Sequence, residues 1–174
     1  MARRPSIKTA LPGPKAAAVI SMSEHYVSNS YTRDYPLVAE QGSGCWITDI
    51  DGNEFLDMTA GIAVTATGHC HPEITKVISE QAGRLLHMSG TDFYYSPQAR
   101  YASEICKHVP VKGGRARVYF GNSGAEAVEA AMKLARWKTR RPNFISFFNA
   151  FHGRTFGAVS LTASKVIQKT GFAP

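Results

Sequence analysis

The fold class is decided by residues 117–138, which read RVYFGNSGAEAVEAAMKLARWK. The first four residues are typical of a strand, and the next four are small turn-forming residues. Residues 125–138 predict a helix, because their apolar positions recur at helical spacing. A second strand is predicted at residues 144–148. Strands that alternate with helices favour an α/β domain with a largely parallel sheet.

The turn before the predicted helix has the chemistry of a phosphate-binding site. The first backbone N–H groups of a helix are unpaired and lie at the positive end of the helix dipole, so they attract anions. Ser123 can add a hydroxyl group, and Gly124 lets a ligand approach the backbone closely. The pattern fits equally well a capping box of Ser123 and Glu126 without any ligand. It lacks the lysine of a nucleoside-triphosphate P-loop.

A loop with the sequence FHGRT, residues 151–155, follows the predicted strand at 144–148. Ligands of open α/β sheets bind beyond the carboxyl ends of the strands. The ring of Phe151 can stack on a flat cofactor, and the guanidinium of Arg154 can hold a carboxylate through two hydrogen bonds. The alternative is a surface loop with a solvated arginine, which is the commoner situation for such a loop taken alone.

The first part of the chain predicts an arm, a hairpin and two helices. Residues 1 to about 40 are expected to be extended, because prolines and glycines interrupt any helix there. Residues 45–50 and 54–58 predict two strands joined by an Asp-Gly turn. Helices are expected to begin at Pro72 and at Ser96, the latter as N-cap.

Composition and charge exclude several classes of protein. The chain has 174 residues, 44% of them hydrophobic and 19% charged, which suffices for a globular core. No apolar run approaches the roughly 20 residues that cross a bilayer, so no membrane contact is expected. The net charge of +7 is spread along the chain, which does not favour a nucleic-acid partner.

The cysteines and histidines do not predict a disulfide framework or a metal site. Cys45, Cys70 and Cys106 form an odd and sparse set, typical of reduced thiols in a cytoplasmic protein. His69 and His71 flank Cys70, but such close neighbours cannot easily face one ion. We therefore expect no metal, and we expect the two histidines to form local hydrogen bonds.

Taken together, six motifs resemble the class III pyridoxal-phosphate-dependent aminotransferases, most closely 4-aminobutyrate and acetylornithine aminotransferases. The resemblance runs from about Leu37 to the end of the chain. The motifs are GCWITDIDGN at 44–53, AGIAV at 60–64, GHCHP at 68–72, NSGAEAVE at 122–129, KLAR at 133–136 and FHGRT at 151–155.

The resemblance implies a fold, a cofactor and partners. The fold is the N-terminal part of the large-domain fold of pyridoxal-phosphate-dependent transferases (fold type I), an α/β fold whose sheet is incomplete here. Residues 1–80 would form the arm and hairpin segment of the small domain with a connecting helix. Residues 81–174 would begin the large cofactor-binding domain. The cofactor would be pyridoxal 5′-phosphate, the substrates an amino acid and a 2-oxo acid, and the full-length protein a homodimer.

The resemblance also implies roles for single residues, which fall into two groups. The cofactor-binding residues would be Ser123, Gly124 and Ala125 at the phosphate, Phe151 on the pyridine ring, and His152. The substrate-binding residues would be Arg154, which grips a carboxylate, and Ile62, at a position where 4-aminobutyrate enzymes carry an aliphatic residue and ornithine enzymes a tyrosine.

None of the family's catalytic residues is expected within these 174 residues. The Schiff-base lysine, the aspartate on the pyridine nitrogen and a phosphate-binding threonine of the family all lie further along. Lys165 and Lys169 do not match the lysine motif. The expected activity of the full-length protein is transfer of an amino group from an amino acid such as 4-aminobutyrate to a 2-oxo acid. The alternatives are an amino-acid racemase of the same family and an inactive fragment that lacks the lysine.

Overall fold

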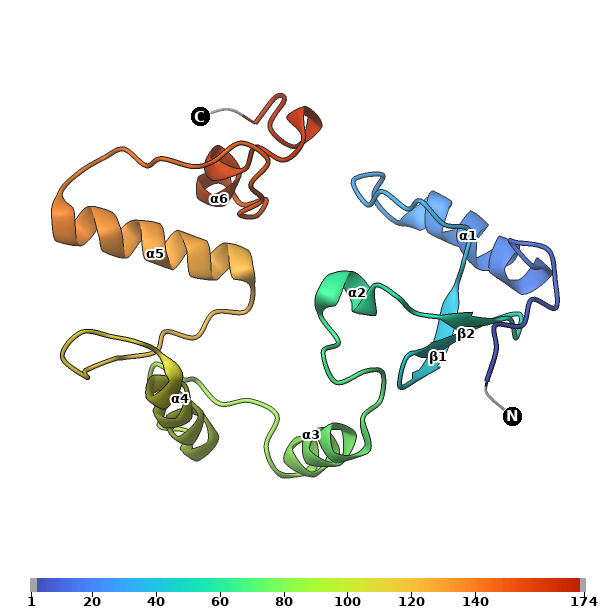
Figure 1. The fold of residues 1–174 in the computed structure, drawn as a ribbon, viewed down its shortest axis with the longest axis horizontal. Coiled ribbons are helices and arrows are strands. Elements are labelled where there is room, and N and C mark those ends of the chain that lie inside the picture. Colours follow the sequence, from blue (N-terminus) through green and yellow to red (C-terminus); the bar gives the residue numbers. More distant parts are fainter. Residues whose placement is uncertain (1–2, 173–174) are drawn as a thin grey trace. The chain divides into compact units, whose positions relative to one another are not determined.

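The computed structural model describes residues 3–172. They form two compact units, which divide between Met88 and Ser89; Figure 1 shows the elements of both in chain order. The predicted domain boundary, between residues 80 and 81, falls inside the helix α3 (Pro72–Arg84). The assignment of the two parts to a small and a large domain stays a prediction.

The first unit contains a helix where an extended arm was predicted. This helix, α1 (Pro14–Tyr26), shows that the prediction was wrong over these residues. Pro14 occupies the first helical position, where its fixed φ and missing N–H are tolerated. The carboxylate of Asp51 accepts the N–H groups of Lys15 and Ala16 at 3.0 and 2.9 Å and so caps the helix from outside. The proline that was taken as a helix breaker therefore marks the helix start.

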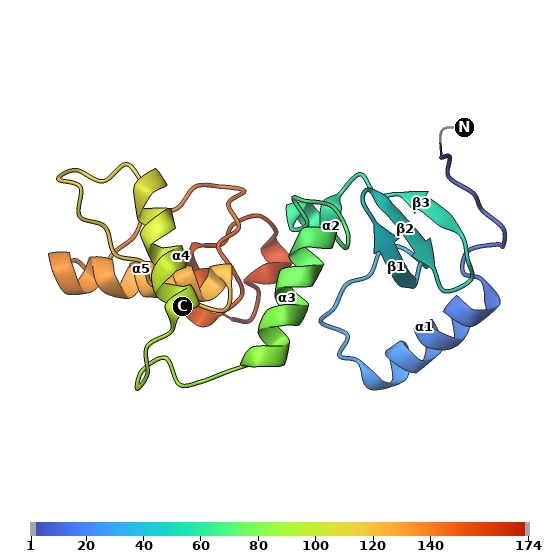
Figure 2. The same cartoon turned by 90° about the horizontal axis from the view of Figure 1, so that it is seen from below.

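One antiparallel sheet of three strands lies in this unit, in the order β1-β2-β3 (Figure 2). The hairpin of β2 (Trp46–Asp49) and β3 (Glu54–Leu56) confirms the Asp-Gly turn, in which Gly52 has a φ of 84°. Strand β1 (Ala39–Ser43) was not predicted, because its sequence, AEQGS, has no branched or aromatic residue. It forms because β2 offers an open edge to pair with.

A fully buried amide, that of Asn53, ties the arm to the hairpin. Its oxygen accepts the N–H groups of Lys8 and Thr9 at 2.6 and 3.0 Å. Its nitrogen donates to the Thr9 hydroxyl and to the carboxylate of Asp49 at 2.9 and 2.7 Å. The side chain thus satisfies two donors and two acceptors and leaves no position for water or for a shorter residue.

The element α2 (Ala60–Ala63) is a left-handed turn, because φ is positive at all four of its residues, between 49° and 65°. Each non-glycine residue in this conformation costs about 1–2 kcal/mol. The carboxylate of Asp57 holds the turn by accepting the N–H groups of Thr59 and Ala60 at 2.8 and 2.9 Å. The hydrogen bond from His69, at 2.6 Å, is the main reason why the pKa of Asp57 lies far below its ordinary value, followed by these two backbone bonds.

The segment between α2 and α3 contacts the turn between β1 and β2 at Gly68. At Gly68 the close neighbour is the chain itself, because a Cβ there would lie 2.9 Å from the carbonyl oxygen of Gly44. Gly44 and His69 exchange two backbone hydrogen bonds of 2.9 and 2.8 Å. Within residues 3–172, no group of three His, Cys, Asp or Glu side chains is arranged to hold a metal ion.

The second unit contains α4 (Ser96–His108), α5 (Gly124–Thr139), α6 (Phe156–Leu161) and the short 3-10 helix η1 (Val166–Gln168). The predicted helices are confirmed to within two residues, although Tyr95 and not Ser96 is the N-cap of α4. Every residue of α4 is half-buried or exposed. In the part of the chain that the structure describes, no helix is long and apolar enough to span a membrane.

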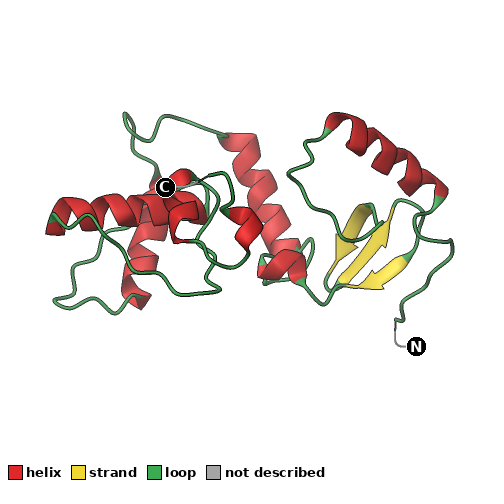
Figure 3. Ribbon diagram, turned by 90° about the horizontal axis from the view of Figure 1, so that it is seen from above, coloured by secondary structure: helices red, strands yellow, loops and turns green. Residues whose placement is uncertain are grey.

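The strands predicted at 117–120 and 144–148 are not formed, and Figure 3 shows strands in the first unit alone among the described residues. Both segments lack a neighbouring strand among the described residues with which to exchange hydrogen bonds. Several of their apolar side chains stay exposed, among them Ile145 to 95% and Phe148 to 94%. The sheet predicted as parallel is therefore absent from residues 3–172, and the sheet that is present is antiparallel.

Candidate cofactor site

The start of α5 combines a capping box with free hydrogen-bond donors. The Ser123 hydroxyl, at the N-cap, accepts the N–H of Glu126 at 3.1 Å, and the Glu126 carboxylate accepts the N–H of Asn122. The N–H groups of Gly124 and Ala125 have no acceptor among residues 3–172. The box and the phosphate-binding turn are thus compatible, because the box uses neither of these two donors.

Two glycines near this turn have opposite surroundings, one open and one closely packed. A Cβ at Gly124 would meet no atom within 4 Å, so the backbone there faces open space. Gly153 has a φ of 132°, and a Cβ there would lie 2.7 Å from that of Ala125 and 3.0 Å from that of Ala158. Gly153 therefore brings the loop 151–155 directly against the start of α5.

The turn and the loop line one hollow of about 650 Å³. Six of the seven predicted site residues meet there, from positions almost 30 residues apart in sequence. They are Ser123, Gly124, Ala125, Phe151, His152 and Arg154, and Val128, Gly153 and Thr155 complete the lining. The roles assigned to the six stay predictions.

The aromatic side chain of Phe151 and the cationic side chain of Arg154 lie close together in the loop. The guanidinium carbon of Arg154 lies 5.8 Å from the ring centre of Phe151, within the range of a cation–π contact. No carboxylate of the described residues pairs with Arg154, so its hydrogen-bonding fork is available to an anion. Phe151 is 52% exposed, which leaves part of its ring free to cover a flat ligand.

A fully buried hydroxyl, that of Thr162, holds the first half of the loop. It accepts the N–H of His152 at 3.0 Å and lies within donating distance of the carbonyl oxygens of Gly153 and Ala158, at 3.0 and 3.2 Å. Sequence reasoning missed Thr162, since a lone threonine beyond a loop carries no local signal.

Glu129 holds the second half of the loop. It forms no ion pair with Lys133, which lies one turn further along α5 in the described part of the chain. The Glu129 carboxylate instead accepts the Thr155 hydroxyl at 2.6 Å and the Ala158 N–H at 3.1 Å. The bond from Thr155 is the main reason why the pKa of Glu129 is lowered. One signal was available, because Glu129 lies one turn after Ala125 on the same face of α5.

The seventh predicted residue, Ile62, lies in the first unit. It occupies the left-handed turn Ala60–Ala63, and its side chain is 93% exposed.

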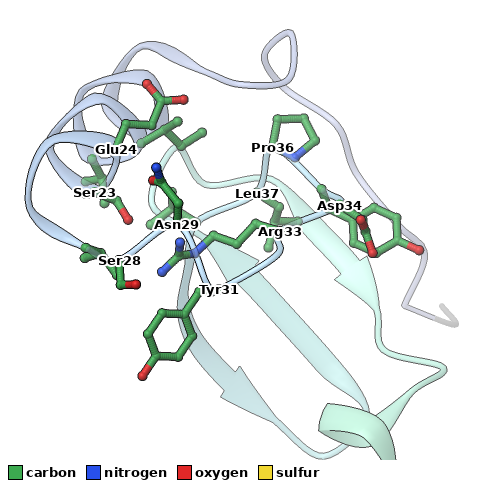
Figure 4. A pocket seen from close by; sticks show the side chains of 14 residues that line it. Ser23, Glu24, Ser28, Asn29, Tyr31, Arg33, Asp34, Pro36 and Leu37 are labelled. Atoms are coloured by element: carbon green, nitrogen blue, oxygen red, sulfur yellow. The ribbon is translucent and has the colours of Figure 1, made fainter. Parts of the chain in front are cut away.

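A second hollow, of about 720 Å³, lies in the first unit between the end of α1 and residues 27–38 (Figure 4). Arg33 extends into it, with its guanidinium carbon 5.6 Å from the ring centre of Tyr31. None of the predicted site residues lines this hollow.

Comparison with known proteins identifies the family. Residues 26–174 match the family model for aminotransferase class III. The chain is 42% identical over 168 residues to an acetylornithine aminotransferase of Methanosarcina acetivorans, an alignment that covers 97% of this chain and 41% of that protein. It is 37% identical over 172 residues to an alanine/serine racemase of Pyrococcus horikoshii, covering 98% and 36%. The chain thus spans about two fifths of the length of the curated relatives it matches.

Solved structures of aminotransferases support the same family. The taurine:2-oxoglutarate aminotransferase of Bifidobacterium kashiwanohense, in complex with PLP and glutamate, superimposes with a TM-score of 0.77 at 28% identity, over 89% of this chain and 34% of that one. The described residues thus have part of the fold type I architecture of pyridoxal-phosphate-dependent transferases. The chain belongs to the class III aminotransferases, a family that depends on pyridoxal 5′-phosphate.

Proposed function

We propose that the full-length enzyme binds pyridoxal 5′-phosphate in the hollow between the α5 turn and the loop 151–155. By full-length enzyme we mean a chain of the relatives' length that contains these 174 residues. One observation carries the proposal: the free N–H groups of Gly124 and Ala125 open into the same hollow as Phe151 and Arg154. A cofactor with an anionic phosphate and a flat ring needs this combination of donors and aromatic surface.

Each residue of the hollow has a distinct part in this proposal. The N–H groups of Gly124 and Ala125, with the Ser123 hydroxyl, hold the phosphate at the positive end of α5. Phe151 covers one face of the ring, with His152 beside it. When bound, the cofactor supplies an electron sink for the reacting amino acid.

Arg154 and Ile62 are the residues that we assign to the substrate. The Arg154 guanidinium grips the substrate carboxylate through two parallel hydrogen bonds, and Ile62 gives the substrate an aliphatic contact. The reaction is the transfer of an amino group from an amino acid to a 2-oxo acid. The similarity to acetylornithine aminotransferases makes N-acetylornithine the first amino donor to test, and the aliphatic Ile62 makes 4-aminobutyrate the second.

The second candidate function is racemisation of an amino acid, which the similarity to the alanine/serine racemase favours. The two activities are distinguished by incubating a single enantiomer of alanine with the cofactor and no 2-oxo acid. Appearance of the opposite enantiomer would identify a racemase. A transaminase yields no opposite enantiomer under these conditions and stops after releasing about one equivalent of pyruvate per site.

We also propose that the 174 residues alone do not turn over and that the full-length enzyme is a homodimer. The first follows from the resemblance, by which the catalytic lysine lies outside these residues. The second rests on the resemblance to the family, whose members it implies to be homodimers. Added cofactor, 4-aminobutyrate and 2-oxoglutarate should give no glutamate above the cofactor-only control, and light scattering should report twice the chain mass of the full-length enzyme.

The test of the cofactor site is Gly124→Val in the full-length enzyme. The fold should tolerate the valine, because no atom lies within 4 Å of the new Cβ, but its side chain would stand where the phosphate must approach. The matched control is Gly83→Val, a helical and exposed glycine of α3 that is equally free of neighbours. We expect dialysed Gly124→Val to lose most of its bound cofactor while its melting temperature without cofactor matches that of the control. Wild-type occupancy in Gly124→Val would place the phosphate elsewhere.

A further inference from the structure

The loop 151–155 supplies Phe151 and Arg154 to the hollow, although it belongs to no helix or strand. Its geometry therefore depends on side chains that hold it from outside. Thr162 holds its first half through His152 and Gly153. The second half leads straight into α6, so whatever fixes the start of α6 also fixes the loop.

The short helix α6 does not cap itself. Its N-cap residue, Thr155, makes no side-chain hydrogen bond to the N–H groups of its own helix. The Thr155 hydroxyl donates instead to Glu129 of α5 at 2.6 Å, and the same carboxylate oxygen accepts the Ala158 N–H at 3.1 Å. Ala158 is the third residue of α6, the position whose N–H an N-cap side chain normally satisfies. Glu129 thus does for α6 what Thr155 would ordinarily do.

The surroundings of Glu129 are adapted to this contact. A Cβ at Gly157 would lie 2.7 Å from the Glu129 side-chain carbon Cδ, so only glycine admits the carboxylate to the start of α6. A negative charge is favourable there, because the first N–H groups of a helix carry partial positive charge. The pKa of Glu129 is lowered by the same hydrogen bonds, so the carboxylate stays ionised at neutral pH. The contact joins α5, which begins with the proposed phosphate-binding turn, to α6, which follows the loop 151–155.

We propose that Glu129 is a positioning residue, which locks the loop 151–155 against α5 so that Phe151 and Arg154 face the phosphate-binding turn. The inference rests on the proposed function, because the loop has something to position only if the hollow holds the cofactor. Glu129 does not line the hollow and acts through Thr155, which does.

The experiment compares Glu129→Ala and Glu129→Gln in the full-length enzyme, with Lys138→Ala as a matched control. Lys138 is an exposed residue near the far end of the same helix. Amide hydrogen exchange of Ala158 is measured without cofactor, and the dissociation constant of pyridoxal phosphate by absorbance titration. In Glu129→Ala, the Ala158 amide should exchange faster and the cofactor should bind roughly tenfold more weakly, because a charged acceptor is lost. Glu129→Gln keeps an oxygen acceptor and should restore most of both properties.

Results that contradict the role of Glu129 can be distinguished from a result that contradicts the cofactor site. Faster Ala158 exchange with wild-type cofactor affinity in Glu129→Ala would overturn the inference, since the loop would then need no lock. Equal weakening in Glu129→Ala, Glu129→Gln and Lys138→Ala, with an equal fall in melting temperature, would overturn it as well, by showing a general effect on stability. If the Gly124 variant binds cofactor like the wild type, the proposed site itself fails, and the inference falls with it.

Discussion

The fully buried polar side chains of the two units, Asn53 and Thr162, hold together different parts of the structure. In the first unit, Asn53 bonds to Lys8 and Thr9, which precede it by 45 and 44 residues, and so closes the arm onto the hairpin. In the second unit, Thr162 bonds to residues no more than ten positions away, all in the loop that lines the cofactor hollow or in α6. The buried amide therefore supports the fold, and the buried hydroxyl supports the site.

The largest effect should come from removing the amide. Asn53→Ala leaves the part-buried N–H groups of Lys8 and Thr9 without an acceptor and removes one of the three hydrogen bonds to the Asp49 carboxylate, which should lower the free energy of unfolding by about 3–5 kcal/mol. Urea unfolding of the full-length enzyme measures this, with the exposed Asn29→Ala as control. A loss below about 1 kcal/mol would mean that water replaces the amide and that the comparison of the two units is wrong.

The next effect should fall on the substrate and not on the fold. Arg154→Lys replaces a fork with a point charge, so kcat/KM for N-acetylornithine and 4-aminobutyrate should fall about ten- to a hundredfold, or roughly 1.5–3 kcal/mol. An uncharged amine of similar length should react nearly as in the wild type, and stability should change by no more than about 0.5 kcal/mol. Equal losses on charged and uncharged donors would refute the carboxylate contact.

Removal of the buried hydroxyl should have a smaller and local effect. Thr162→Val keeps the shape but leaves the His152 N–H without an acceptor, which we expect to cost about 1–2 kcal/mol. The His152 amide should exchange faster and cofactor affinity should fall, while Thr170→Val, at an exposed threonine of the same unit, should change neither. Should Thr162→Val unfold the protein as Asn53→Ala does, the distinction between a fold-supporting and a site-supporting network disappears.

Phe151→Ala should weaken cofactor binding several-fold, because a stacked ring contributes about 1 kcal/mol beyond its buried area. The cofactor absorbance should shift, and the melting temperature of the cofactor-free protein should stay unchanged. Phe156→Ala, at an exposed ring one residue beyond the loop, is the control. Unchanged affinity together with a lower melting temperature would show that Phe151 packs against the protein instead of the cofactor.

The smallest and most specific effect should be a pH dependence in the first unit. Folding lowers the pKa of Asp57. The ionised carboxylate therefore stabilises the protein fully above the ordinary pKa of an aspartate, and this stabilisation is lost as the pH falls towards the lowered pKa. The difference in melting temperature between wild type and Asp57→Asn should therefore be largest near pH 7 and smaller at pH 3. Repeating the comparison in a His69→Gln background tests the main partner. A difference independent of pH would contradict this assignment.

The elements that sequence could predict are those whose partners lie nearby in the chain. The Asp-Gly turn specifies β2 and β3, and a proline at the first turn marks α3. The strands predicted at 117–120 and 144–148 did not form, because a parallel strand depends on a distant neighbour and none is available among the described residues. The α1 prediction failed because Pro14 was weighed without its distant cap, Asp51.

The same rule holds for the candidate site. Its lining from Ser123 to Arg154 could be predicted, because a turn at a helix start and a loop after a strand-like segment each have a local signature. Thr162 could not, and for Glu129 the one signal was its place one turn after Ala125, because the function of both residues arises only when α5, the loop and α6 pack together.

The contact between Gly153 and Ala125 also determines how this region can diverge over evolutionary time. A side chain at 153 is excluded both by its φ of 132° and by the 2.7 Å approach of Ala125, so neither position can grow to compensate a change in the other. Gly124 experiences no such limit from residues 3–172, and under the proposed function it is the cofactor that keeps it a glycine. In a lineage that abandons the cofactor, Gly124 should be replaced early, while Gly153 should persist for as long as the chain still folds.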